Sequence, residues 1–247
     1  MADSVFYSQK PIFSTPERKN VPVLQFEPSP GRTIFQLKDP GSAVTHFVGL
    51  VLAIVATPPL LIHGAGEGYS RMQMAALSVF LLSMVGLYAA STAYHSFDLE
   101  KGRNRILKKL DHIMIFVLIA GTYTPICLTT LAGKGGEGLL LAVWAVALGG
   151  LVLKLFWVYH PKWLSSVLYI GMGWLCLTKL PTIWAVMPRP GFWWLLAGGV
   201  FYTIGGVLYA LRLERLNTLH PHFGSHEIFH LFVMAGTACQ YVTMFYL

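Results

Sequence analysis

Long apolar blocks separated by short polar segments make up the chain after its first 40 residues. Seven of these blocks approach or exceed the roughly 20 residues that a helix needs to cross a bilayer. They cover Val44–Ile62, Met74–Phe97, Ile106–Leu131, Leu139–Tyr159, Leu164–Val186, Phe192–Leu213 and Gly224–Leu247. Lys179 and Pro181 interrupt the fifth block. The blocks are too long and alternate too little for membrane strands, so the pattern predicts an all-α bundle of seven transmembrane helices.

The composition supports this fold class. Of the 247 residues, 55% are hydrophobic and only 12% are charged, whereas soluble domains carry about twice that charge. Residues 1–40 differ from the rest because they are polar, contain several prolines and lack the apolar stretch of a signal peptide. We therefore expect a polar N-terminal arm over residues 1–40 and a transmembrane domain over residues 41–247.

The basic residues predict the orientation of the bundle. Of the 18 lysines and arginines, 14 flank the helices on the side of the N-terminus, three lie on the opposite side and one lies within the fifth block. Because cytoplasmic loops carry the excess of positive charge, the N-terminus is expected in the cytoplasm and the C-terminus outside. The same bias explains the net charge of +7. No nucleic-acid-binding motif accompanies it, so we expect no nucleic-acid partner.

Polar and ionisable residues from four helices fall at one predicted depth, near the cytoplasmic side. His226 and His230, at the start of the last helix, share one face because they are four residues apart. The other helices contribute His46, Ser91, His95, Asp111 and His112. Such residues are costly inside a membrane, so their gathering indicates a functional site.

Three imidazoles and a carboxylate at one level are typical of zinc chemistry. Three protein ligands and one open position characterise catalytic zinc sites, and such a metal lowers the pKa of a water that it binds. His95, His226 and His230 are the predicted ligands, Asp111 the group that deprotonates the water, and Ser91 a nearby orienting group. A thiolate site is not expected, because the three cysteines form no C-x-x-C pair.

The segment His226–His230 also matches H-E-x-x-H, the pattern of zinc proteases with a glutamate base. In that interpretation Glu227 is the base. However, His230 is the only Asp, Glu or His after Glu227, so a third ligand must come from an earlier helix. Glu227 also lies about 100° around the helix from His226. The alternative role of Glu227 is that of a carboxylate at a helix N-terminus.

Several stretches resemble the hemolysin III family, within the superfamily of progestin and adiponectin receptors and alkaline ceramidases. The matching stretches are Thr45–Gly49, Ser91–Phe97, Leu110–His112, Gly121–Pro125 and Ser225–Gly236. The resemblance implies seven helices with a cytoplasmic N-terminus, and zinc held by His95, His226 and His230. It further implies that Asp111 contacts the metal-bound water and that Ser91 stands close by. The chain departs from the expected family pattern at Gln240, where many members are expected to have histidine.

The resemblance also implies a class of function. Related members are lipid amide hydrolases or receptors, and bacterial members are linked to membrane homeostasis, with a name that reflects reported cytolysis. We therefore expect a multi-pass protein of the bacterial plasma membrane that acts on a membrane lipid as substrate or ligand. Three functions stay open: a zinc-dependent hydrolase of lipid amide or ester bonds, a non-catalytic sensor with structural zinc, and a cytolytic pore. His46, His112 and Glu227 are expected to lie near the site without belonging to the metal ligands.

Overall fold

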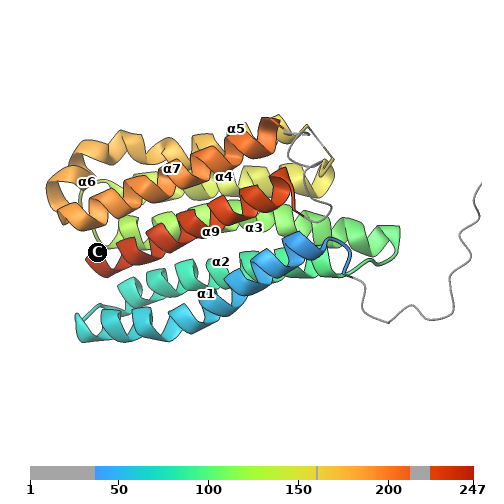
Figure 1. Ribbon diagram of the computed structural model, residues 1–247. Coiled ribbons are helices and arrows are strands. Elements are labelled where there is room, and N and C mark those ends of the chain that lie inside the picture. The colour runs from blue at the N-terminus through green and yellow to red at the C-terminus, as the bar shows by residue number, and fades with distance from the viewer. Residues whose placement is uncertain (1–36, 160, 212–222) are drawn as a thin grey trace, which may run out of the picture. The chain divides into compact units, whose positions relative to one another are not determined.

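A computed structural model describes residues 37–159, 161–211 and 223–247 of the chain. Within these residues all regular elements are helical (Figure 1). The α-helices are α1 (Pro40–Gly66), α2 (Arg71–Ser96), α3 (Lys101–Leu128), α4 (Gly136–Phe156), α5 (Lys162–Gly173), α6 (Leu180–Val186), α7 (Arg189–Leu211) and α9 (Ser225–Thr243), and the 3-10 helices are η1 (Trp174–Lys179) and η2 (Met244–Tyr246). The described residues contain seven spans long and apolar enough to cross a membrane, which confirms the predicted fold class.

The fifth span is broken. The break begins at Trp174, earlier than the residues that interrupt its apolar pattern, and α5, η1 and α6 together make the span. Inside a bilayer, backbone groups freed by such a break need partners from the protein. The hydroxyl of Tyr123 on α3 supplies them: it donates to the carbonyl oxygen of Gly173 at 2.5 Å and accepts from the backbone N–H of Cys176 at 2.9 Å.

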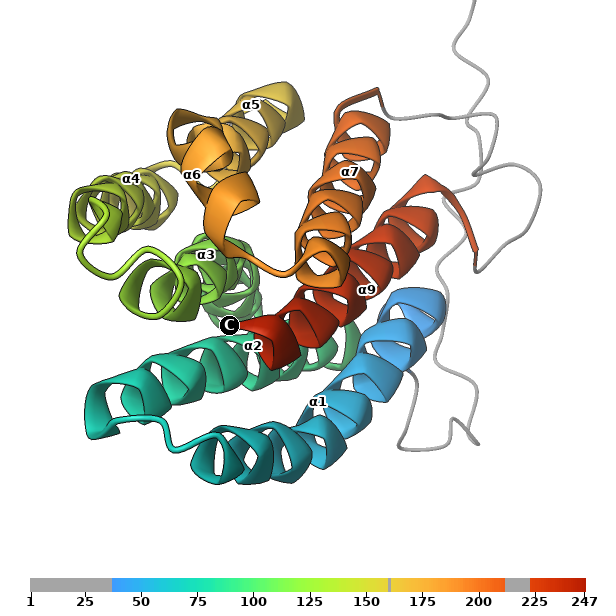
Figure 2. The same cartoon turned by 90° about the vertical axis from the view of Figure 1, so that its left-hand side faces the viewer.

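The helices form a ring in which the last packs against the first (Figure 2). Each helix packs against the next one in the order α1, α2, α3, α4, α5, α7 and α9, and α9 also packs against α1. Helix α3 is the most buried span, since 67% of its apolar 18-residue stretch is buried inside the protein, against at most 50% for any other span. Closure of the ring places the start of α9 beside α1, at the end of the bundle where α3 also begins and α2 ends. We call this end the histidine end.

Small residues allow the helices to approach closely. A Cβ atom on Gly121 of α3 would lie only 2.8 Å from Cβ of Ser83 on α2. On α9, a Cβ atom on Gly236 would lie 2.6 Å from the ring of Tyr202 on α7. In a bilayer, helix association depends on such close packing, because lipid tails are as apolar as the helix surfaces. These contacts fix how α2, α3, α7 and α9 present their polar side chains.

The predicted N-terminal arm falls almost entirely on residues 1–36, which lie outside the described residues. Of its last residues, Asp39 is the N-cap residue of α1, and α1 begins at Pro40. The cytoplasmic position of the N-terminus stays a prediction based on the distribution of lysine and arginine.

Candidate metal site

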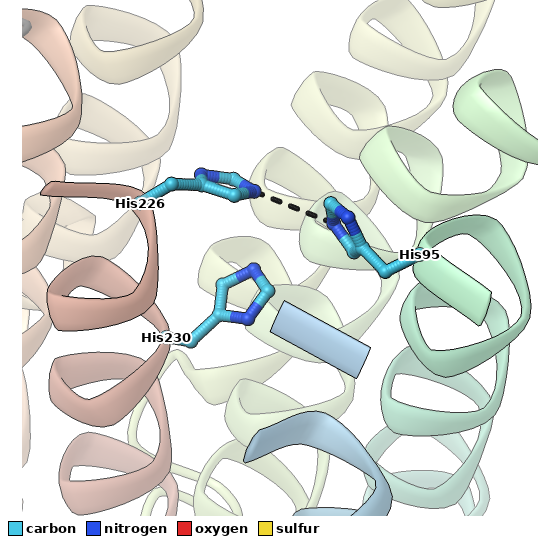
Figure 3. Close-up of side chains that lie close together, drawn as sticks. All are labelled: His95, His226 and His230. Atoms are coloured by element: carbon cyan, nitrogen blue, oxygen red, sulfur yellow. Dashed lines mark hydrogen bonds between the residues drawn. The ribbon is translucent and has the colours of Figure 1, made fainter. Parts of the chain in front are cut away.

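Three histidines from two helices converge at the histidine end. His95 comes from the last turn of α2, and His226 and His230 come from the first turns of α9 (Figure 3). One ligand atom from each ring lies within 4.8 Å of the other two. The Nε2 atoms of His95 and His226 are 3.3 Å apart. The fold therefore brings together the three residues that the sequence predicted as metal ligands.

The outward nitrogens of two rings are held by oxygen atoms. His95 Nδ1 lies 2.9 Å from a carboxylate oxygen of Asp39, which can only accept, so this nitrogen carries the proton. His230 Nδ1 lies 3.2 Å from the hydroxyl oxygen of Thr45. That hydroxyl donates to the backbone carbonyl oxygens of Gly41 and Ser42, so its oxygen accepts from His230. Both tautomers leave a bare Nε2, which is the form that binds a metal.

The convergent nitrogens fit a divalent cation. Bare Nε2 atoms carry lone pairs that repel one another across a short buried gap, unless a cation or proton lies between them. His95 and His230 are 3% and 2% exposed, so little water is available to screen that repulsion. Outside the membrane spans, the hydrogen bond from His95 lowers the pKa of Asp39, which keeps this carboxylate charged. The donor set matches the preference of zinc for imidazole ligands.

Asp111 faces the same space. Together with His226 and His230 it lines a small cavity of about 20 Å³, which has room for one or two water molecules. Its Oδ2 atom lies 3.1 Å from His112 Nδ1. Ser91, one turn before His95, is 1% exposed; it interacts electrostatically with Asp111, but its hydroxyl makes no hydrogen bond within the described part of the chain. The structure thus places Asp111, the predicted proton acceptor, beside His226 and His230, and Ser91, the predicted orienting group, near Asp111.

His46 and His112 also border the small cavity. The ring of His46 stacks on His230 with centroids 3.6 Å apart and an angle of 11° between the planes. Neither ring nitrogen of His46 has a hydrogen-bond partner among the residues that the structure describes, although both are buried. His112 Nε2 lies 3.4 Å from the hydroxyl of Tyr209. Both histidines are therefore neighbours of the three convergent rings.

Glu227 has a different environment. One carboxylate oxygen accepts from the backbone N–H of Gly224 at 2.7 Å, and the other accepts from the hydroxyl of Ser42 on α1. Glu227 is not among the residues that line the small cavity. Its carboxylate holds the first turn of α9 to α1, as expected of an acid at a helix N-terminus.

Sequence reasoning missed two residues that hold the histidine rings. Asp39 lies 56 positions before His95 and belongs to the segment interpreted as a polar arm. Thr45 lies 185 positions before His230. Thr45 stands in a family-like stretch, but no local spacing connects it to the last helix. Neither contact follows from a pattern along the chain, because both depend on how the ring of helices closes.

An apolar cavity lies next to the small one, inside the bundle. Its volume is about 120 Å³, room for on the order of ten water-sized groups. The two cavities share four lining residues: Leu87, Ile115, Phe229 and Val233. Along α9 the lining extends from Phe229 to Gln240, which corresponds to about 16 Å of helix. The polar residues that line the small cavity thus lie at one end of a long apolar cavity.

Comparison with known proteins identifies the family of the chain. Residues 35–241 match the sequence model of a family described as "Haemolysin-III related". The chain belongs to this family. The haemolysin-III-related chain is 37% identical over 209 residues to "Hemolysin-3 homolog" of Bacillus subtilis (strain 168), covering 84% of this chain and 93% of the relative. It is 36% identical over 209 residues to "Hemolysin-3" of Bacillus cereus, covering 85% and 91%.

A more distant relative connects the family to receptors. The haemolysin-III-related chain is 24% identical over 237 residues to "Adiponectin receptor protein" of Drosophila melanogaster, covering 85% of this chain and 51% of the relative. This match agrees with the superfamily that the sequence motifs indicated. Together with the seven spans, the bacterial relatives identify a multi-pass integral protein of the plasma membrane.

Proposed function

We propose that this protein is a zinc-dependent hydrolase of amide or ester bonds in membrane lipids, with a role in membrane homeostasis. One observation carries the proposal: His226, His230 and Asp111 line a small cavity, with His95 converging on the two histidines, and a long apolar cavity inside the bundle lies next to it. A lipid with a carbonyl group at the head of an acyl chain matches both parts of this space. The carbonyl group suits the histidines and Asp111, and the acyl chain suits the apolar cavity.

The residues of the site have separate roles in the proposed hydrolysis. His95, His226 and His230 would hold the zinc ion, and three imidazole ligands would leave one position for water or substrate. When bound, zinc lowers the pKa of a water molecule and polarises a carbonyl group. Asp111 would take a proton from a water molecule as the oxygen of that water bonds to the carbonyl carbon, and would pass it to the nitrogen or oxygen that leaves when the C–N or C–O bond breaks. The buried hydroxyl of Ser91, near Asp111, is available to orient that carboxylate.

The apolar cavity holds the acyl chain. Its room for on the order of ten water-sized groups suits a similar number of methylene groups. Transfer of a chain from the bilayer into the cavity gains little hydrophobic free energy, because both surroundings are apolar. The cavity therefore selects by shape and length, and it places the carbonyl group at the small cavity. An ion-conducting pore has less support, because polar groups concentrate at the histidine end and a conducting path needs them through the full depth.

The test is hydrolysis by the purified protein in lipid nanodiscs. Ceramides and phospholipids are supplied, and released fatty acid is measured by mass spectrometry with and without a zinc chelator. We expect release that the chelator, His95→Ala and Asp111→Asn each abolish. Glu227→Gln is the matched control, because it removes a carboxylate at the same end of the bundle and should keep activity. Loss with Glu227→Gln and retention with Asp111→Asn would restore the protease-like assignment.

The second candidate is a non-catalytic sensor with structural zinc, favoured by the match to a protein named as a receptor. In that case Asp111→Asn keeps both the bound zinc and the function in the membrane. Wild-type protein that binds zinc and releases no fatty acid from any of these lipids would replace the hydrolase with the sensor.

A further inference from the structure

Asp39 occupies the N-cap position of α1, directly before Pro40. Aspartate at this position ordinarily accepts a hydrogen bond from a backbone N–H in the first helical turn. Here the side chain makes no such bond. The carboxylate instead turns to another helix and lies 2.9 Å from His95 Nδ1. Helix capping therefore does not account for this residue.

The backbone around Asp39 is fixed to the same histidine. The N–H of Asp39 donates to the carbonyl oxygen of His95 at 2.9 Å, and the N–H of Lys38 donates to the carbonyl oxygen of Ser96 at 3.3 Å. The ammonium group of Lys38 donates to the carbonyl oxygen of Tyr94 and lies 3.5 Å from the centre of its ring. Residues 38 and 39 are thus held against the end of α2 at several points, so the carboxylate is preorganised for the imidazole.

Charge gives a second reason for the contact. Three neutral imidazoles leave the two positive charges of a zinc ion uncompensated, and the surroundings are largely buried. Asp111 supplies one negative charge beside the small cavity. Asp39 supplies the other through His95; 45% of its side chain is exposed, and its carboxylate also lies 3.9 Å from the ammonium group of Lys38. Thr45, the corresponding partner of His230, is neutral, so the charge enters through His95 alone.

We propose that Asp39 is a positioning residue of the metal site, which orients His95 through its Nδ1–H and compensates the charge of the bound cation. The inference rests on the proposed zinc site, but not on hydrolysis. Partners of this kind raise the basicity of the ligand, and their removal typically lowers metal affinity by about 10- to 100-fold. The same range is expected for Asp39→Ala, with a smaller loss for Asp39→Asn, which keeps the acceptor and removes the charge.

The test measures metal binding by the full chain in detergent. Zinc affinity is determined by competition with a chelating dye, and the absorption spectrum of bound cobalt reports the geometry of the ligands. We expect Asp39→Ala to weaken zinc binding by about 10- to 100-fold and to shift the cobalt bands. Asp39→Glu should restore a large part of the affinity, since it keeps the charge. The melting temperature of each metal-free variant shows whether it is folded.

A control variant separates positioning from general effects. Glu100→Gln removes an exposed carboxylate at the same end of the bundle. It should bind zinc like the wild type. Zinc affinity and cobalt bands unchanged in Asp39→Ala would overturn the inference and leave the proposed hydrolase intact. Wild-type protein with no measurable zinc affinity would overturn both, whereas tight binding without hydrolysis would overturn the hydrolase alone.

Discussion

Two adjacent glycines on α7 should respond in opposite ways to the same substitution. A Cβ atom on Gly198 would lie 2.9 Å from Cδ of Gln240 and 3.1 Å from the carbonyl oxygen of Gly236, both on α9. A Cβ atom on Gly199 would meet only a ring carbon of Trp174, at the ordinary contact distance of 3.9 Å. Gly198→Ala should therefore destabilise the protein by forcing α7 away from α9, and Gly199→Ala should not.

The magnitude follows from two costs. Adding a methyl group to a closely packed interface costs about 1–3 kcal/mol. The obstructing amide of Gln240 also donates to the carbonyl oxygen of Leu195 at 3.1 Å, and breaking that bond costs a further 0.5–1.5 kcal/mol, roughly. Because the change to alanine also gains up to about 1 kcal/mol of helix propensity, we expect Gly198→Ala to lower the free energy of unfolding by about 1–4 kcal/mol, which corresponds to a melting temperature about 2–16 °C lower. Gly199→Ala gains up to about 1 kcal/mol of helix propensity.

Thermal unfolding in detergent, followed by tryptophan fluorescence, measures both variants. The double variant Gly198→Ala with Gln240→Ala adds a specific check. If Gln240 is the obstacle, the two substitutions together should cost less than the sum of their separate effects. An unchanged melting temperature for Gly198→Ala, or an equal loss for Gly199→Ala, would refute the packing argument.

Three further substitutions test other parts of the structure. His226→Ala should lose most of the zinc that atomic spectroscopy detects in the purified protein, and unchanged zinc would disprove the ligand assignment. The buried ammonium of Lys154 donates to the hydroxyl of Ser165 at 2.7 Å and has no carboxylate partner among the described residues. Lys154→Met should therefore leave the melting temperature unchanged or raise it. A large decrease in the melting temperature would contradict this. Ser42→Ala removes a partner of Glu227 and should lower the melting temperature by about 2–4 °C, as expected for about 1 kcal/mol, whereas loss of zinc would assign Glu227 to the metal site.

The membrane spans and part of the site follow from local features of the sequence. A span requires about 20 apolar residues in a row, which is a property of the chain alone. The common face of His226 and His230 follows from their spacing of four residues. His95 and Asp111 were included in the predicted site for another reason. Successive helices cross the membrane in opposite directions, so residues from distant segments can lie at one depth. Depth, however, does not determine which side chains touch.

Contacts between helices were decided by the tertiary structure. The Nε2 atoms of His95 and His226 belong to residues 131 positions apart, and they meet because α9 closes the ring beside α1. Asp39 looked like part of a polar arm, but the fold presents its carboxylate to His95. Glu227 stood inside a protease-like pattern, but its carboxylate bonds to Ser42 and Gly224. Local spacing determines which face of a helix a side chain occupies, whereas its partner depends on the packing of helices far apart in the chain.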